Sequence, residues 1–131
     1  MNNEELIHLA IEARKNAVSP TGYYVGSAIY TTSGKVYTGC NLATEDGLYN
    51  FCAEQTAIVK MFSEGKEQIE KIAVVGGKGE DLIFTTPCGI CRQLLLDVSP
   101  KCEVICAYQE NGTITYQSFT AKELLPHGYE M

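Results

Sequence analysis

The feature that most constrains the fold is the alternation of helical and strand-like patterns along the chain. Apolar residues recur at helical spacing in some stretches, while others are short, apolar and rich in β-branched or aromatic residues. The order is a helix, two strands, a helix, a strand, a helix, two strands and a helix, over residues 3–17, 24–31, 35–41, 52–63, 69–76, 88–97, 102–108, 113–118 and from Thr120 onward. Helices that interleave with strands buried on both faces predict an α/β fold, a three-layer α/β/α sandwich around a mixed five-stranded sheet.

Turn-forming residues separate these stretches. Thr32-Ser33-Gly34 and Asn111-Gly112 each lie between two strand-like runs and predict hairpins. Residues 42–50 are polar and are expected to form a loop. The glycine-rich residues 76–79 are expected to form a turn, because they lack the spacing of a phosphate-binding loop and no helix follows at once.

Length and charge narrow the possible functions. The chain has 131 residues, which is the length of one domain, so we expect residues 1–131 to form a single unit. Ten basic and sixteen acidic residues give a net charge of −6, which argues against a globally basic nucleic-acid binder. No apolar run approaches the ~18 residues of a membrane span, and the N-terminus lacks the pattern of a signal peptide. We expect a cytoplasmic protein that binds neither membranes nor nucleic acid.

Cysteines are the main candidates for chemistry. Without an export signal, metal binding or catalysis is favoured over disulfides. Cys88 and Cys91 form a C-x-x-C pair, and Pro87 before them predicts that they lie at a helix start. Cys52 opens another predicted helix, and the partial positive charge of a helix N-terminus favours thiolates. The six cysteines are Cys40, Cys52, Cys88, Cys91, Cys102 and Cys106.

This arrangement predicts a zinc site at two helix N-termini. Thiolates of Cys52, Cys88 and Cys91 would bind one Zn²⁺ and leave the fourth position for water, as in catalytic zinc sites. Glu54 would then lie beside the water as a proton acceptor and donor, not as a ligand. A redox pair or a closed structural site is the alternative, and the latter needs a fourth ligand from Cys40, Cys102 or Cys106. Our first interpretation of Cys102 and Cys106 is that they are small buried apolar residues.

Two short motifs resemble those of a known family. Cys52-Ala53-Glu54 followed by Pro87-Cys88-Gly89-Ile90-Cys91 matches the H-x-E and P-C-x-x-C signature of the zinc deaminases, with Cys in place of His. The chain resembles the cytidine deaminase superfamily over nearly its whole length, and within it the blasticidin-S deaminases as well as the cytidine deaminases. Flanking residues extend the match: Gly39-Cys40-Asn41, Thr56-Ala57, Ser63-Glu64-Gly65, Arg92-Gln93 and Glu123-Leu124-Leu125-Pro126.

The resemblance implies a reaction and an assembly. It implies a homotetramer with one zinc ion per chain that hydrolyses the 4-amino group from a small cytosine nucleoside. In the implied mechanism the zinc ion lowers the pKa of its water. Glu54 accepts the water proton, delivers it to ring N3 and later protonates the leaving amine.

The resemblance also implies substrate contacts. Asn41 matches a residue that holds the sugar or base, and Tyr23 takes the place of a phenylalanine beside the base. Ala53, between the first zinc ligand and Glu54, is assigned to the substrate site with them. Ser27 stands where cytidine deaminases have Ala and blasticidin-S deaminases have Ser. The ending Leu-Pro-His-Gly-Tyr129 is of the blasticidin type, and its aromatic residue is implied to reach a neighbouring subunit's active site.

Two departures from the family pattern bear on specificity and charge. Ala43 replaces a glutamate that binds the ribose hydroxyls, although Glu45 is close enough in sequence to replace that carboxylate. Gln55 replaces an arginine that offsets the negative charge of three thiolates around Zn²⁺. Arg92, directly after Cys91, is the candidate for this zinc-charge compensation.

We rank the possible functions accordingly. A deaminase of a blasticidin-S-like nucleoside comes first, and a cytidine or deoxycytidine deaminase of pyrimidine salvage is the alternative. The rival from another class is a structural zinc or thiol-redox protein, which would not need Glu54. A deaminase that edits polynucleotides is disfavoured by the charge of −6 and by the short chain.

Overall fold

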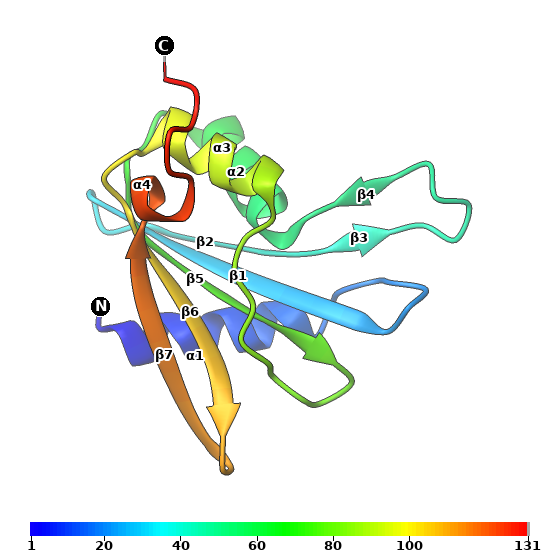
Figure 1. Ribbon diagram of the computed structural model, residues 1–131. Helices are drawn as coiled ribbons and strands as arrows, with labels where there is room; N and C mark the ends of the chain where they lie inside the picture. The colour runs from blue at the N-terminus through cyan, green and yellow to red at the C-terminus, as the bar shows by residue number, and fades with distance from the viewer. Residues whose placement is uncertain (131) are drawn as a thin grey trace.

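Five strands form one mixed sheet through the middle of the molecule (Figure 1). The computed structural model describes residues 1–130, so Met131, the last residue of the predicted domain, lies outside the described residues. The strands are β1 (Tyr23–Thr31), β2 (Val36–Cys40), β5 (Ile69–Lys78), β6 (Glu103–Glu110) and β7 (Thr113–Thr120). Their order is β2-β1-β5-β6-β7. β5 and β6 are parallel and the other pairs antiparallel, which confirms the predicted mixed sheet.

Helices cover both faces of the sheet (Figure 1). Helix α1 (Asn3–Arg14) lies on one face, whereas α2 (Ala53–Glu64) and α3 (Gly89–Val98) lie on the other, with the short α4 (Ala121–Leu124) beside α3. The three-layer α/β/α sandwich is therefore confirmed. In the part of the chain that the structure describes, no helix has the length and apolar character needed to cross a membrane.

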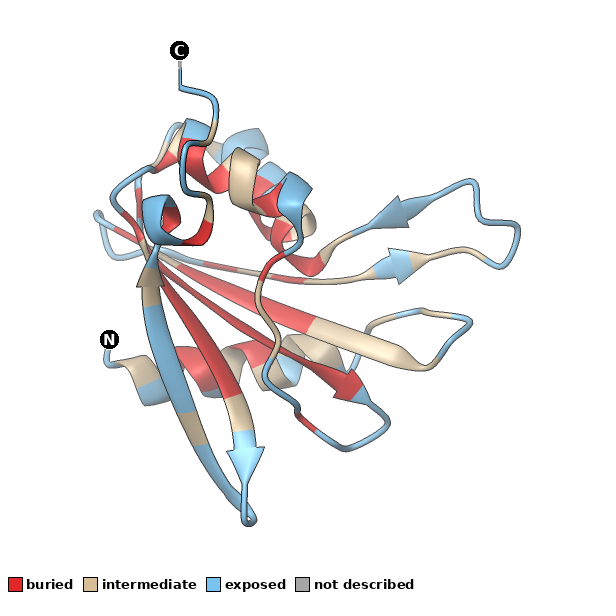
Figure 2. Ribbon diagram, in the orientation of Figure 1, coloured by how far each residue is buried: buried red, intermediate tan, exposed pale blue. Residues whose placement is uncertain are grey.

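The central strands are buried on both faces, as Figure 2 shows. Along β5, Ala73 and Val75 pack toward α1, whereas Ile72 and Val74 pack toward α2 and α3. This alternation is the period of two expected of a strand between helical layers. The sheet thus provides a rigid platform on which the N-termini of α2 and α3 are placed.

The glycine-rich residues 76–79 were expected to form a turn, but the strand runs on to Lys78 and the turn begins only at Gly79. Strand β5 continues through Gly76 and Gly77, which pair with Val25 and Tyr24 of β1. A Cβ atom at Gly77 would lie 1.9 Å from the carbonyl oxygen of Asp81. The glycine there lets the chain fold back closely at the end of the strand, where the Asp81 N–H donates to the Lys78 carbonyl at 3.1 Å and closes a turn.

Residues 42–50 are also more ordered than the predicted loop. Strands β3 (Leu42–Ala43) and β4 (Asn50–Phe51) pair with each other and form an arm beside the main sheet (Figure 1). At its tip the Asp46 carboxylate accepts hydrogen bonds from the Thr44 hydroxyl at 2.6 Å and from the Leu48 N–H at 3.1 Å. The arm leads directly into Cys52, so its position helps to set the start of α2.

Candidate metal centre and active site

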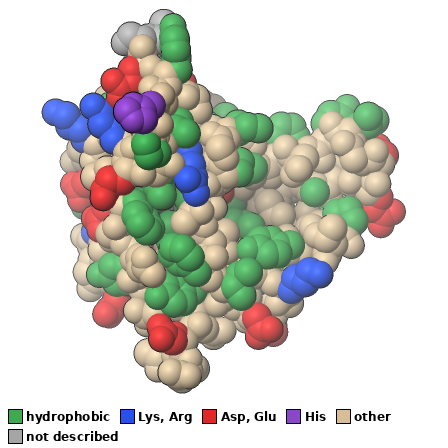
Figure 3. Space-filling model, in the orientation of Figure 1, with side chains coloured by type: hydrophobic (Ala, Val, Ile, Leu, Met, Phe, Trp, Pro, Cys, Tyr) green, Lys and Arg blue, Asp and Glu red, His purple; other side chains and the backbone are tan. Residues whose placement is uncertain are grey.

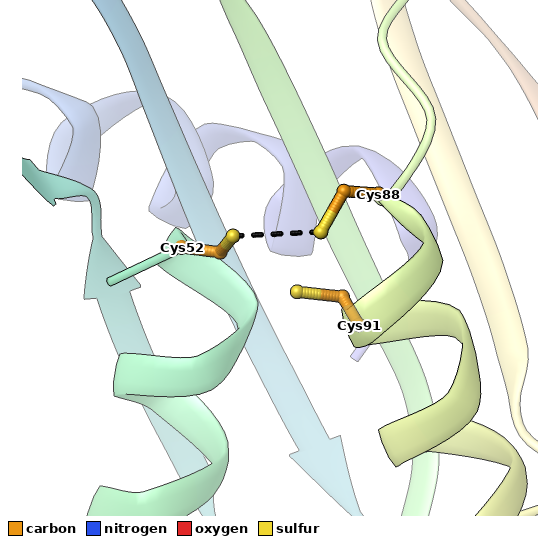
Figure 4. A group of neighbouring side chains, drawn as sticks. All are labelled: Cys52, Cys88 and Cys91. Carbon is orange, nitrogen blue, oxygen red and sulfur yellow. Dashed lines mark hydrogen bonds between the residues drawn. The ribbon is translucent and has the colours of Figure 1, made fainter. Parts of the chain in front are cut away.

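The N-termini of α2 and α3 place three cysteines together (Figure 4). Cys52 is the N-cap of α2 and Cys88 the N-cap of α3, and both have extended backbone conformations. Cys91 follows in the first turn of α3, so the C-x-x-C spacing puts both α3 thiols at the same helix end. The partial positive charge of both helix termini therefore acts on the same group of sulfur atoms.

The distances between the sulfur atoms suit a zinc ion. All three Sγ atoms lie within 4.8 Å of one another, and those of Cys52 and Cys88 are 3.6 Å apart. Two sulfurs bound tetrahedrally at ~2.3 Å from zinc would be about 3.8 Å apart. The residues present therefore fit zinc, with a small adjustment of the side chains.

The remaining cysteines do not complete a four-ligand site. Within residues 1–130, the group that can hold a metal contains Cys52, Cys88 and Cys91 and no further His, Cys, Asp or Glu. Cys102 and Cys106 are buried in the core between the sheet and the helices α2 and α3, as first interpreted from the sequence. A three-thiolate site leaves room for a further ligand, which is the arrangement of catalytic zinc.

The three thiols differ in how readily they ionise. Burial raises the pKa of Cys52 to about 11, and it also raises the pKa of Cys91, where the nearby charge of Glu54 adds to the effect. Burial opposes ionisation of Cys88 too, but the nearby backbone N–H groups of Cys91 and Ile90 and the neighbouring thiols favour its charged form, so that its pKa falls below the usual value. A cation is needed to hold all three as thiolates, and its binding releases protons.

Glu54 lies beside this group but is buried. It is the second residue of α2 and only 3% exposed. Burial raises the pKa of its carboxyl group, partly offset by hydrogen bonds from its own backbone N–H and from the Cys91 thiol. A buried carboxyl with a raised pKa, next to a metal-binding group, is typical of a residue that exchanges protons during catalysis.

Gln55 was missed as a structural part of the site. Its side-chain oxygen accepts a hydrogen bond from the backbone N–H of Cys52 at 2.8 Å, which fixes the N-cap of α2. The signal was present in the sequence, because a Gln three residues after an N-cap is the second half of a capping box. Cys52 occupies the position where such a box normally has Ser or Thr.

Two of the predicted substrate residues, Asn41 and Tyr23, make side-chain hydrogen bonds to other segments of the chain. The Asn41 side-chain oxygen accepts from the N–H of Val25 at 2.8 Å, and its nitrogen donates to the carbonyl of Tyr23 at 3.1 Å. The Tyr23 hydroxyl lies 2.9 Å from that of Thr85. Their assignment to substrate binding stays a prediction.

The other predicted substrate residues occupy different environments. Ser27 and Ala53 are fully buried, and the Ser27 hydroxyl donates to the Ala53 carbonyl at 2.8 Å. This bond ties β1 to the first turn of α2. Tyr129 is 71% exposed, and its carbonyl accepts from the Gln93 side chain at 2.9 Å. The structure therefore places Ser27 against the first turn of α2, which directly follows Cys52 in the sequence, whereas the side chain of Tyr129 is exposed.

The chain is similar to known deaminases over nearly its whole length. Residues 1–107 match the family model described as "Cytidine and deoxycytidylate deaminase zinc-binding region". A cytidine deaminase of Halalkalibacterium halodurans is 36% identical over 131 residues, covering 98% of this chain and 95% of the relative. A blasticidin-S deaminase of Bacillus cereus is 29% identical over 130 residues, covering 95% and 90%. The crystal structure of a cytidine deaminase from Burkholderia pseudomallei superposes with a TM-score of 0.83 at 33% identity, covering 98% and 100%.

Proposed function

Because the chain belongs to the cytidine and deoxycytidylate deaminase family, we propose that it hydrolyses cytidine or deoxycytidine to the uracil nucleoside and ammonia. The observation that carries the proposal is the cluster of three thiols at two helix N-termini with buried Glu54 beside it. A structural zinc protein would need neither an open ligand position nor a buried carboxyl group.

The site residues have two separate roles in the reaction, metal binding and proton transfer. Cys52, Cys88 and Cys91 hold the zinc ion. When bound, Zn²⁺ supplies Lewis-acid activation of a water molecule. The Glu54 carboxylate would accept one proton from the attacking water and pass it to N3 while the water oxygen bonds to C4 of the cytosine ring. It would then take the proton of the new C4 hydroxyl and give it to the 4-amino group, so that the C4–N bond breaks, ammonia leaves and C4 becomes a carbonyl carbon. The burial that raises the Glu54 pKa suits this carboxyl to giving back the proton that it accepts.

The relatives support a different order of substrates from the one that the sequence alone suggested. That order put a blasticidin-S-like nucleoside first, because of Ala43, Ser27 and the ending at Tyr129. The relative from Halalkalibacterium halodurans is named cytidine deaminase and is 36% identical, whereas the blasticidin-S deaminase is 29% identical. Cytidine and deoxycytidine are therefore the proposed substrates, and blasticidin S is the second candidate.

An ultraviolet deamination assay tests the proposal. The zinc-loaded protein is given cytidine, deoxycytidine and blasticidin S, and kcat/KM is measured for each. We expect a higher value for cytidine or deoxycytidine than for blasticidin S. The reverse order would establish the second candidate, and no turnover of any of the three would contradict a nucleoside deaminase.

The surface supports an assembly of several chains. Large apolar side chains are exposed on the arm and on α2 and α3, and Figure 3 shows the surface hollowed between the arm and the body. Apolar surface of this kind marks contacts with other proteins. The proposed unit is a homotetramer in which residues 1–131 form one domain and Tyr129 enters a neighbouring site. The exposed side chains include Leu48, Tyr49, Phe51, Val59 and Ile90.

A further inference from the structure

Arg92 directs its guanidinium at oxygen atoms instead of at the thiols. Its Nε donates to the carbonyl of Pro87, its Nη2 to the hydroxyl of Thr86 and its Nη1 to the carbonyl of Leu124, each at 2.7 Å. Among the hydrogen bonds of residues 1–130, none joins Arg92 to a sulfur atom. The side chain is half-buried, so these bonds are partly shielded from water.

The acceptors of these bonds determine what the guanidinium holds. Thr86 and Pro87 directly precede Cys88, and Arg92 follows Cys91, so the contact closes a short loop that carries both α3 ligands. The bond to Leu124 joins the same loop to the last residue of α4. The Arg92 guanidinium therefore holds the segment that precedes α3 and connects it to the end of α4.

At the N-terminus of each metal-binding helix, a side chain holds the backbone next to a zinc ligand. Cys52 is held by Gln55, which accepts its backbone N–H within the first turn of α2. Cys88, the N-cap of α3, has no side-chain capping bond of its own. Arg92 holds the residue before it instead, through the Pro87 carbonyl. Groups that fix ligands in this way raise the affinity of a metal site without touching the ion.

We propose that Arg92 is a positioning residue of the metal centre, which holds the Thr86–Pro87 segment so that Cys88 reaches the zinc ion. This inference rests on the zinc site and not on which nucleoside is the substrate. It differs from charge compensation, the role that the sequence suggested for Arg92. The fork of donors holds three oxygens at once, which a lysine ammonium on a flexible stem does not reproduce.

Two substitutions separate geometry from charge. Arg92→Lys keeps the positive charge but loses the fork, whereas Arg92→Gln loses both. Zinc affinity of the full-length protein is measured by competition with a chromogenic chelator, in the absence of any nucleoside. We expect both variants to bind zinc about 10–100-fold more weakly, the usual effect of removing a group that orients a ligand. Lys122→Ala is the matched control, because it removes an exposed charge from α4 without a bond to the loop, and it should bind zinc like the parent.

Charge compensation by Arg92, the competing role, predicts a different result. If Arg92→Lys keeps the parent affinity and Arg92→Gln loses it, the charge is what matters and the positioning role is wrong. If both variants keep the parent affinity, Arg92 does not support the site at all. Because zinc is titrated without substrate, a failure here is distinct from a failure of the proposed deamination.

Thr86 provides a milder pair in case the Arg92 variants do not fold. Thr86→Val removes the hydroxyl that accepts from Nη2 at nearly the same shape, and Thr86→Ser keeps a hydroxyl. Zinc affinity should fall several-fold in the Val variant and return in the Ser variant. The visible bands of the cobalt-substituted protein report the ligand geometry, and they should shift in the Val variant alone. Parent-like affinity and bands in Thr86→Val would overturn the proposal.

Discussion

Glu54 is the residue whose role is the simplest to isolate, because Glu54→Gln keeps the shape of the side chain and removes its ability to exchange protons. The site keeps its three thiols, so the variant should retain its zinc. Turnover should fall by about 10²–10⁴, as expected when a general acid–base is lost. Elemental analysis and the ultraviolet assay measure the two quantities. A variant that loses its zinc would show that Glu54 is a ligand.

Ala43 is the residue at which substrate preference is tested. It is half-buried at the end of β3, opposite Asn50 of β4. A carboxylate that accepts ribose hydroxyls is worth about 1.5–3 kcal/mol. Ala43→Glu should therefore raise kcat/KM for cytidine roughly ten- to a hundredfold. Unchanged or lower cytidine turnover would show that the ribose is bound elsewhere.

At the scale of elements, the zinc ligands join two helices that have no covalent link nearby. Cys52→Ser, Cys88→Ser and Cys91→Ser should each lose zinc and lower Tm, because metal binding contributes to folding free energy. Cys102→Ser is the control, since Cys102 lies in the core and outside the metal group. It should keep its zinc, whatever its Tm. Unchanged zinc content in all three ligand variants would refute the site.

The buried cysteines of the core give a separate prediction. Burial raises the pKa of Cys102 and of Cys106 to about 12, so both stay protonated near neutral pH, whereas the thiolate is the reactive form. In the folded protein both should resist a thiol reagent, even after a chelator has exposed the three ligand thiols. Mass spectrometry of the labelled protein identifies the modified residues. Labelling of Cys106 before unfolding would contradict the core packing.

The sequence predicted the elements that carry the site better than those beside it. Pro87 and the apolar spacing that follows marked the start of α3, and Cys52 marked that of α2, because capping is local. The continuation of β5 through Gly77 and Lys78 was missed because it depends on pairing with Tyr24 and Tyr23 of β1, which lie far away in the sequence and leave no local pattern. The arm was missed because β3 and β4 have two residues each, too few for a period of two to appear.

The contacts of Arg92 show the same limit at the site itself. Its place after Cys91 was visible in the sequence, and charge was the only role that position suggested. Leu124 lies 32 positions away in the chain, so the bond that joins α3 to α4 depends on the packed fold. Spacing predicts which residues share a helix end, whereas the partner of a long side chain depends on tertiary structure.

At the scale of the whole molecule, the C-terminal tail presents an aromatic ring away from its own chain. The Tyr129 side chain is 71% exposed, whereas the backbone of the tail is held by hydrogen bonds, because the Gln93 side chain donates to the Tyr129 carbonyl at 2.9 Å and the Gly128 N–H donates to the Leu125 carbonyl at 3.1 Å. An ordered backbone with an outward ring suits a contact with another subunit. The proposed homotetramer is therefore best tested at this residue.

Deletion of residues 128–131 removes Tyr129 together with Met131, which lies outside the described residues. Activity should fall because a neighbouring site loses one wall, while zinc content stays the same because the ligands are untouched. Tyr129→Phe is the matched control, since it keeps the ring and should keep most of the activity. Light scattering reports the assembly, and the parent should have the mass of four chains. A parent that is monomeric and a truncated form that is fully active would together show that each site is complete within one chain, so that the outward ring serves some other contact.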